Sequence, residues 1–363
     1  MKPSSKARRY PAVIVIAVLL ASLLTACSGS GNEGNSASAA DETPSATPDY
    51  GKSAELLVAT ADGTETFYKE LNDTFAKTRK ETTGQTVTFQ SSSAPSSEQE
   101  QAVISGTLKA DVVTLGVGID IDAIQAKGII GEGWQQRYDY NSSPYSTAVA
   151  FLVRAGNPKG VQDWKDLLKP DIAIVTSDAS VYSDARWYYA GAWAYAMNDS
   201  GDDQESAKKF VTDVFGHVKT LAPNDGEALA DFLQKGEGDV LLTTENKALE
   251  AANGPDKGKV EVVVPAITLS VEPIVSVVDK NADAKGVREA ANAYVDFLYT
   301  EEAQKIAAKH FFRPRFLSVA EQFTGQFPEV TLLTVDDNLT GWEDLQAALF
   351  SDGGLVAQLK ASK

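Results

Sequence analysis

The fold class follows from one stretch of sequence, ELLVATADGTETFYKELNDTFAKTRK, at residues 55–80. Its first seven residues form an apolar run that is typical of a buried strand. A polar loop at 62–64 separates this run from a segment in which Phe67, Leu71 and Phe75 recur every four residues. That spacing places the three side chains on one face of a helix. The stretch therefore predicts a buried strand, a short loop and an amphipathic helix.

The same order of elements repeats along the chain. Further strands are predicted at 85–91, 111–117, 147–154, 171–176, 238–244, 260–266 and 273–279, and further helices at 97–106, 120–127, 184–197, 203–215, 225–235, 285–299 and 301–309. Such alternation indicates an α/β fold with largely parallel sheets. The less regular tail, residues 316–363, predicts a short strand and one or two helices. We expect Leu345, Leu349 and Leu355 to pack it on the body.

Composition excludes several classes of protein. The 363 residues suit one large two-lobed unit or two domains, and a hydrophobic content of 43% is that of a globular protein. The chain has 50 acidic and 33 basic residues, for a net charge of −17. This balance argues against a nucleic-acid binder and against a polybasic membrane-surface protein. One cysteine and two histidines leave no internal disulfide and no tetrahedral Cys/His zinc site.

The N-terminus resembles the leader of a bacterial lipoprotein. Basic residues precede an apolar run at 11–24, which is short for a transmembrane helix and typical of a signal peptide. Leu24-Thr25-Ala26-Cys27 then resembles a lipobox, in which Cys27 is lipidated and becomes the mature N-terminus. An ordinary signal peptide with an incidental cysteine is the alternative. We therefore predict a cleaved leader at 1–26 and a flexible tether at 27–53, because its Ser, Gly, Ala and Pro content cannot bury enough apolar surface to fold.

The inventory of catalytic motifs favours a protein that is not an enzyme. No G-x-S-x-G elbow, no G-x-x-x-x-G-K-[ST] phosphate loop and no G-x-G-x-x-G after a strand occurs. His217 lies near the end of a predicted helix, and His310 stands beside two phenylalanines, so a capping role and a packing role are expected for them. Acidic pairs are typical of solvated faces on so acidic a chain. A carboxylate pair of the glycosidase kind stays open as an alternative.

Polar loops recur where predicted strands end and helices begin, at residues 60–64, 91–97, 176–184 and 222–226. In open α/β sheets, ligands bind beside the carboxyl ends of the strands. Helix N-termini offer unpaired N–H groups and the positive end of a dipole, which suit an anion. The same serines and aspartates are also the usual N-cap residues of ordinary helices. The loops thus predict either a shared ligand cleft or a set of plain helix caps.

Residues 55–315 resemble the solute-binding proteins of sulfate/thiosulfate ABC importers. The matching stretches are ADVVTL (110–115), SPYST (143–147), FLVRAGNPK (151–159), DWKDLLKP (163–170), ARW (185–187), GDVL (238–241), EN (245–246), EP (272–273), SVVDK (276–280) and AAKHFFRPR (307–315). The resemblance implies the type II periplasmic-binding-protein fold, with a hinge and a ligand cleft between two α/β lobes. It implies a first lobe at 54–145 plus 267–315, a second lobe at 146–266, and an extension at 316–363 that packs on the body.

The resemblance also implies a ligand site and shows where this chain departs from it. The family binds its dianion with backbone N–H groups, serine hydroxyls and an indole N–H. Asp62 matches the aspartate of the family's first loop, and Ser96, or Ser97 because the loop lengths differ, matches the serine of the second. The departures are Tyr182-Ser183-Asp184 in place of Ser-Gly-Gly, Asp225 in place of a small residue, and Thr244 in place of the tryptophan before Glu-Asn.

Two interpretations of these departures stay open. An ionised carboxylate about 4 Å from an anion costs about 4 kcal/mol per unit charge at an effective dielectric of about 20. In the first interpretation, Asp184 and Asp225 are N-caps turned away from the cleft, which leaves a modified oxyanion site. In the second, the ligand is a cation, an amine or a neutral polar solute held by carboxylates, Tyr182 and Thr244.

The resemblance thus implies an extracytoplasmic solute-binding lipoprotein of an ABC importer, with no cofactor and no metal. We expect a monomer, anchored to the membrane through Cys27 on a Gram-positive cell surface, whose lobes close on a sulfate-type oxyanion and then dock on the permease. Two other classes stay open. One is a secreted hydrolase with paired carboxylates, and the other is a degenerate family member that serves as a sensor or adhesion module.

Overall fold

The computed structural model describes residues 51–361. The predicted leader at 1–26, Cys27 and the tether up to residue 50 lie outside the described residues. Among the helices of residues 51–361, none is both long and apolar enough to cross a membrane.

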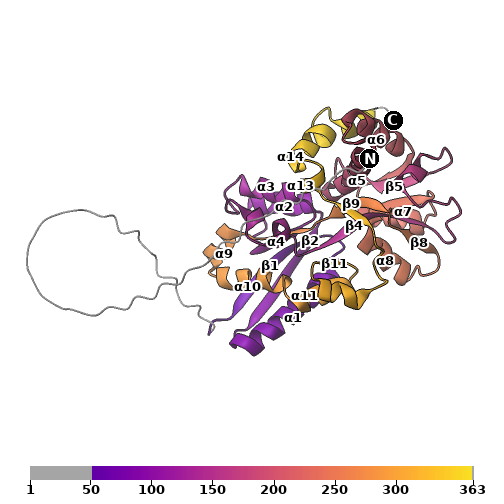
Figure 1. The fold of residues 1–363 in the computed structure, drawn as a ribbon. Coiled ribbons are helices and arrows are strands. Elements are labelled where there is room, and N and C mark those ends of the chain that lie inside the picture. The colour runs from indigo at the N-terminus through magenta and orange to yellow at the C-terminus, as the bar shows by residue number, and fades with distance from the viewer. Residues whose placement is uncertain (1–50, 362–363) are drawn as a thin grey trace, which may run out of the picture. The chain divides into compact units, whose positions relative to one another are not determined.

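The first sheet has four strands in the order β10-β3-β1-β2. They are β1 (Ala54–Ala61), β2 (Val87–Ala94), β3 (Val112–Leu115) and β10 (Ile274–Val277). One face packs against α1 (Glu65–Thr83), α10 (Arg288–Leu298) and α11 (Glu301–Lys309), and the other against α2 (Ser96–Ser105) and α3 (Gly118–Gln125). The predicted apolar face of α1 is confirmed, because Phe67, Leu71 and Phe75 are buried in this core. Figure 1 shows two of the strands, β1 and β2, beside α1.

The second sheet has eight strands and is centred on β4 (Tyr145–Arg154). The others are β5 (Ile174–Ser177), β6 (Val218–Ala222), β7 (Val240–Thr244), β8 (Val260–Val263), β9 (Ile267–Val271), β11 (Arg313–Pro314) and β12 (Thr331–Leu333). The buried faces of α5 (Arg186–Ser200) and α6 (Gln204–Gly216) share one core, and those of α7 (Asp225–Leu233) and α8 (Glu245–Asn253) share another. Two aromatic rings show how tightly the larger core is packed: Trp164 and Phe151 meet edge to face at 4.9 Å.

The α/β class is confirmed, but the sheets are mixed rather than largely parallel. Strand β1 runs parallel to β2 and β3, β5 to β6 and β7, and β12 to β9. Strand β4 runs antiparallel to β7, β8 and β9, and β10 runs antiparallel to β3. Sequence analysis also missed β6 and β9. Strand β9, which it grouped with the first lobe, hydrogen-bonds to β4 in the second sheet. The physical reason is that a single chain crosses between the sheets more than once, and the period-two pattern does not encode which sheet a strand joins.

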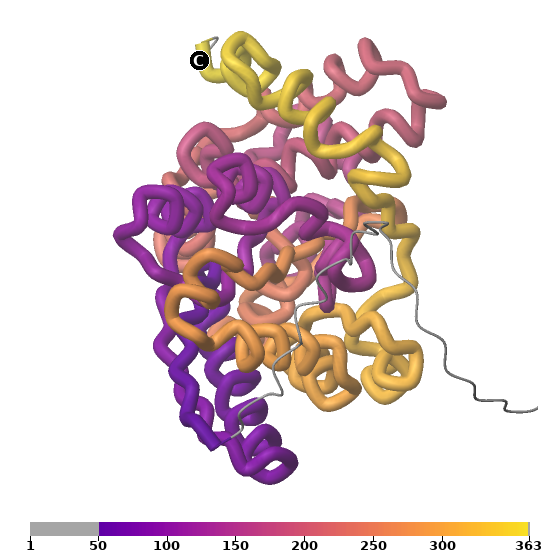
Figure 2. The backbone as a smooth tube through the Cα atoms, turned by 90° about the vertical axis from the view of Figure 1, so that its left-hand side faces the viewer, coloured from indigo at the N-terminus to yellow at the C-terminus, as the bar shows by residue number. Residues whose placement is uncertain are grey.

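The end of the C-terminal tail packs on the helices of the second sheet (Figure 2), while its first helix lies against α11 of the first sheet. It contains α12 (Leu317–Ala320), the 3-10 turn η4 (Glu321–Phe323), β12, α13 (Val335–Asn338), α14 (Trp342–Leu345), the π-helical turn η5 (Gln346–Phe350) and α15 (Leu355–Ala361). The predicted packing of Leu345, Leu349 and Leu355 is confirmed by their burial in the core of α5 and α6. The ring of Trp342 also meets that of Trp187 edge to face at 4.7 Å.

The remaining elements are short. They are α4 (Asp139–Ser142), α9 (Asp279–Lys285) and the 3-10 turns η1 (Trp134–Gln136), η2 (Trp164–Leu168) and η3 (Ser183–Ala185).

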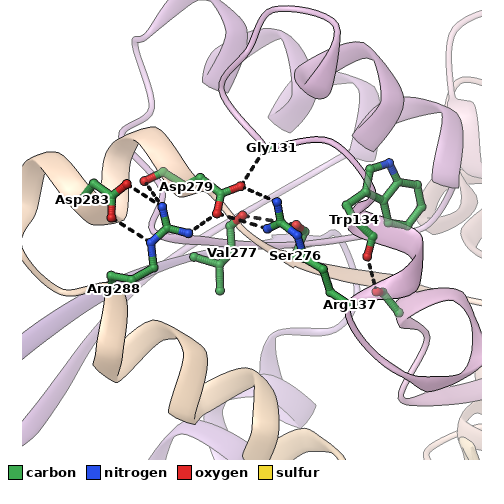
Figure 3. Close-up of polar contacts among 9 residues, drawn as sticks. Gly131, Trp134, Arg137, Ser276, Val277, Asp279, Asp283 and Arg288 are labelled. Atoms are coloured by element: carbon green, nitrogen blue, oxygen red, sulfur yellow. Dashed lines mark hydrogen bonds and ion pairs between the residues drawn. The ribbon is translucent and has the colours of Figure 1, made fainter. Parts of the chain in front are cut away.

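An ionic cluster around Asp279 fixes the end of β10 (Figure 3). Its carboxylate accepts hydrogen bonds from the Gly131 N–H at 2.5 Å and from the Arg137 guanidinium at 2.9 and 3.1 Å, and it also pairs with Arg288. Arg288 in turn donates to Asp283. Burial raises the pKa of Asp279, but the bonds from Arg137, Gly131 and Arg288 outweigh it and hold that pKa below its usual value.

Substitution of Asp279 tests how much this cluster stabilises the fold. We expect Asp279→Asn to lower the free energy of unfolding by roughly 2–3 kcal/mol, because it removes charge-assisted hydrogen bonds and leaves two guanidinium groups without their shared carboxylate. A lowered pKa stabilises the fold above the usual carboxyl range, and that stabilisation disappears as the pH falls through the folded pKa. The loss should therefore be full at neutral pH in urea denaturation and shrink toward pH about 3.

Asp73→Asn is the matched control. Asp73 pairs with Lys69 on the surface of α1, where the two side chains are 68% and 76% exposed. Such a pair contributes little, so this variant should unfold like the parent chain. Equal stability of the Asp279 variant, the control and the parent would show that the cluster does not hold the first sheet together.

Candidate functional site

A cavity of about 60 Å³ lies between the two sheets, beside the carboxyl ends of β1, β3 and β7. A single buried water needs at least about 10–15 Å³, so this space is large enough for a small ligand. Both sheets contribute to its wall: Ala61, Asp62, Thr64, Tyr68, Thr114, Leu115, Gly116, Pro273 and Phe312 on one side, and Tyr145, Thr147, Asp184, Trp187, Tyr188, Asp225, Thr244, Asn246, Lys247 and Val271 on the other.

Lys247 is the one basic side chain among these wall residues, all of which lie in the described part of the chain. It is the third residue of α8, and its Nζ lies 2.6 Å from a carboxylate oxygen of Asp225. Burial alone would lower the pKa of Lys247, but the carboxylates of Asp225, Asp184 and Asp62 raise it above its usual value. The side chain is therefore an ammonium group at any physiological pH.

Asp225 is fixed as the counter-ion of this lysine. Its carboxylate accepts hydrogen bonds from the Ser177 hydroxyl at 2.5 Å, the Tyr188 hydroxyl at 2.6 Å and the Lys247 ammonium. The N-cap of α7 is Asn224, whose side chain accepts from the Glu227 N–H at 2.9 Å. The interpretation of Asp225 as an N-cap turned away from the cleft is therefore wrong.

Asp184 also faces the cavity. It lies in η3, ahead of α5, and its carboxylate accepts from the Ser96 hydroxyl at 3.1 and 3.3 Å. The caps of η3 and α5 are Tyr182 and Ala185, and neither makes a side-chain cap bond, so the capping interpretation is wrong here too. Burial raises the pKa of Asp184 to about 7; Lys247 opposes this shift, and the carboxylates of Asp62, Asp120 and Asp225 add to it.

The segment that carries Asp184 is joined to the first sheet by three further hydrogen bonds. The Tyr182 hydroxyl donates to Asp62 at 3.0 Å, the Ser183 hydroxyl donates to Asp120 at 3.0 Å, and the Trp187 indole donates to the Gly116 carbonyl at 2.8 Å. Burial raises the pKa of Asp62, and that of Asp120 to about 6. Residues 182–187 thus connect the two sheets along one side of the cavity.

Only some of the predicted site residues lie in the wall of the cavity. Asp62, Asp184, Asp225 and Thr244 line the cavity, Ser96 and Tyr182 hold carboxylates in it, Ser183 is directed to Asp120, and Ser97 is absent from the wall. Whether they contact a ligand stays a prediction.

Three buried polar atoms of the wall, Thr114 Oγ1, Thr244 Oγ1 and Asn246 Oδ1, have no hydrogen-bond partner among the described residues. Lys247, Tyr188 and Gly116 were not predicted as site residues. Lys247 could have been found from its position directly after Thr244-Glu245-Asn246, where a predicted strand ends.

The charges of the wall set a limit on the ligand. Three carboxylates face one ammonium group, and an ionised carboxylate about 4 Å from a dianion costs about 8 kcal/mol at an effective dielectric of about 20. A dianion that carries no proton of its own therefore needs Lys247, and it needs at least one of the carboxylates to be neutral. Within residues 51–361, no group of three or more His, Cys, Asp or Glu is placed to hold a metal ion.

Comparison with known proteins gives consistent matches. Residues 56–313 match the family described as bacterial extracellular solute-binding protein. The sulfate-binding protein of Escherichia coli is 40% identical, over 86% of this chain and 95% of its own length, and the thiosulfate-binding protein of Pseudomonas aeruginosa is 38% identical, over 84% and 91%. The solved sulfate-binding protein SubI from Mycobacterium tuberculosis is 29% identical and superposes with a TM-score of 0.73, over 82% of this chain and 100% of that one.

Proposed function

Because this chain belongs to the family of bacterial extracellular solute-binding proteins, we propose that it is the solute-binding component of an ABC importer for a sulfate-type oxyanion. It is a binding protein rather than an enzyme. The relatives named as sulfate- and thiosulfate-binding proteins support this ligand class, since they match along nearly their whole length.

One observation carries the proposal: a small cavity between the two sheets contains a partly buried ammonium group, on a side chain that is 23% exposed. Lys247 has three N–H donors, of which one is directed to Asp225. The others, with the unpartnered hydroxyl of Thr244, are available to oxygen atoms of a ligand. The small volume of the cavity, about 60 Å³, favours a small ligand.

The alternative of a cation, an amine or a neutral solute draws on the carboxylates of the same wall. Asp225 is the counter-ion of Lys247, and Asp62 and Asp184 accept hydrogen bonds from Tyr182 and Ser96. Each carboxylate thus has a partner within the protein, so none of them requires a cationic ligand. The oxyanion is therefore the ligand that we propose.

The finer features of the function rest on the sequence. We propose that Cys27 is lipidated and that the protein acts as a monomer at the extracytoplasmic face of a Gram-positive cell membrane. We also propose that lobes near 54–145 plus 267–315 and 146–266 close about a hinge, and that the closed form docks on the permease, which works with an ATPase subunit. The lipobox and the chain crossings between the sheets support these proposals.

Removal of the ammonium group from the cavity tests the proposed site. We expect Lys247→Met to weaken sulfate binding at least thirty-fold in calorimetry at about pH 6, because truncation of one partner of a buried charge pair typically costs about 2–5 kcal/mol. The variant leaves Asp225 uncompensated, so the double variant Asp225→Asn/Lys247→Met should fold better and still fail to bind.

Lys235→Met is the matched control. Lys235 is exposed on the surface and pairs only with Asp231, four residues before it. This variant should bind sulfate like the parent. A Lys247→Met protein that binds within threefold of the parent would exclude the cavity as the oxyanion site.

Replacement of the single cysteine tests the anchor. In a Gram-positive host, Cys27→Ser should move the protein from the membrane fraction to the medium, because a diacyl anchor adds two buried acyl chains to the mature N-terminus. Ser28→Ala, one residue later, should leave the fractionation unchanged. Retention of the Cys27→Ser protein on membranes would contradict lipidation at this residue.

A further inference from the structure

The carboxylate of Asp184 accepts the hydrogen bond that the Ser96 hydroxyl could otherwise donate to a bound oxyanion. The Ser96 hydroxyl donates its only proton to Asp184 at 3.1 Å, and the Ser96 oxygen accepts from the Gly116 N–H at 2.8 Å. Neither donor is therefore left for a ligand. The carboxylate stands at the edge of the cavity as an acceptor in its own right.

Packing holds this carboxylate in place. It lies so close to Gly116 that a Cβ at that position would overlap Asp184 Oδ1. The carbonyl of Gly116 is in turn bound by the Trp187 indole at 2.8 Å. Gly116 and Ser96, at the start of α2, thus bound the carboxylate on the side of the first sheet, so a ligand meets it from the cavity side.

The surrounding charges leave Asp184 without a cation of its own. Asp62 in the loop after β1, Asp120 on α3 and Asp225 on α7 add negative charge around it, and the one ammonium group, Lys247 on α8, is paired with Asp225 at 2.6 Å. The phenols of Tyr182 and Tyr188 are neutral, because burial holds their pKa values well above 10. An ionised Asp184 and a fully ionised dianion therefore repel one another across the cavity.

We propose that Asp184 and the bound oxyanion share one proton, so that Asp184 determines which oxyanions the cavity accepts. An oxyanion that carries its own proton, such as hydrogen phosphate, donates a hydrogen bond from that proton to the ionised carboxylate. It therefore binds without taking up a proton from solution. The sulfate dianion binds only together with a proton that Asp184 takes from solution. This inference rests on the proposed function, because it names the protonation state in which the same cavity takes its ligand.

The sign of the resulting pH dependence follows from linkage. Burial raises the pKa of the free Asp184 to about 7. Below that pH, Asp184 is already protonated and sulfate affinity is constant. Above it, sulfate binding takes up one proton, so affinity falls about tenfold per pH unit. Hydrogen phosphate, the main phosphate species above about pH 7.5, brings the shared proton and loses no affinity over this range.

Calorimetry of the purified full-length protein with sulfate and with inorganic phosphate tests the proposal. Titrations at about pH 6, 8 and 9, each in two buffers of different ionisation enthalpy, give both affinity and the number of protons taken up. We expect sulfate to take up one proton at pH 8 and 9 and to bind about tenfold more weakly at pH 9 than at pH 8. Phosphate should take up none at either pH.

Two variants separate a shared proton from a general effect of pH. Asp184→Asn supplies an amide donor in place of the protonated carboxyl, so its sulfate affinity should be independent of pH and its binding should take up no proton. Asp213→Asn, on the exposed pair with Lys209, should keep the behaviour of the parent. If Asp184→Asn does not fold, the parent still tests whether binding is coupled to a proton, because sulfate binding without proton uptake overturns the inference.

The outcomes distinguish the shared proton from the proposed function, which is oxyanion binding in the cavity. Sulfate binding with no proton uptake and an equal affinity at pH 6 and 9 would overturn the shared proton and leave the oxyanion site standing. A proton uptake that persists in Asp184→Asn would assign the proton to another group and overturn the inference as well. Failure of both anions to bind at every pH, in parent and variants, would overturn the proposed function and this inference with it.

Discussion

The ion pair between Lys247 and Asp225 is the interaction on which the rest of the site depends. Removal of an ammonium group from water is unfavourable unless a well-placed anion and further hydrogen bonds replace the solvent. Here Asp225 supplies the anion, while Ser177 and Tyr188 fill its remaining acceptor sites. The pair brings together the first turns of α7 and α8 and directs a positive charge into the space between the sheets.

Besides this ion pair, the site requires contact between parts of the chain that lie far apart in sequence, and the fold supplies it. Strands of both sheets end at the cavity, and residues 182–187 reach across to the loops of the first sheet. Several of these cross-sheet bonds end on carboxylates. In the proposed hinge closure, the charge of the cavity would therefore be coupled to closure, since a carboxylate that loses its donor on opening would also gain access to water.

The sequence predicted the parts of this structure that depend on local pattern. The apolar periodicity of α1, the polar loops after the strands and the buried leucines of the tail are all properties of neighbouring residues. The direction of Asp184 and Asp225 was not predictable in this way, because an aspartate at the start of a helix has the same sequence pattern whether it caps the helix or faces a ligand. Lys247 was missed because lysine is rarely buried, and only the fold places it beside Asp225. Likewise, β9 joins the second sheet through its pairing with β4, which is a contact over more than a hundred residues.

The most direct test of the account is a crystal structure of the protein grown with sulfate at about pH 6. The account predicts a sulfate ion in the cavity between the sheets, with one oxygen within about 3 Å of Lys247 Nζ and another at a similar distance from the Asp184 carboxyl. An empty cavity with sulfate bound elsewhere, or an Asp184 side chain turned out of the cavity into solvent, would contradict it.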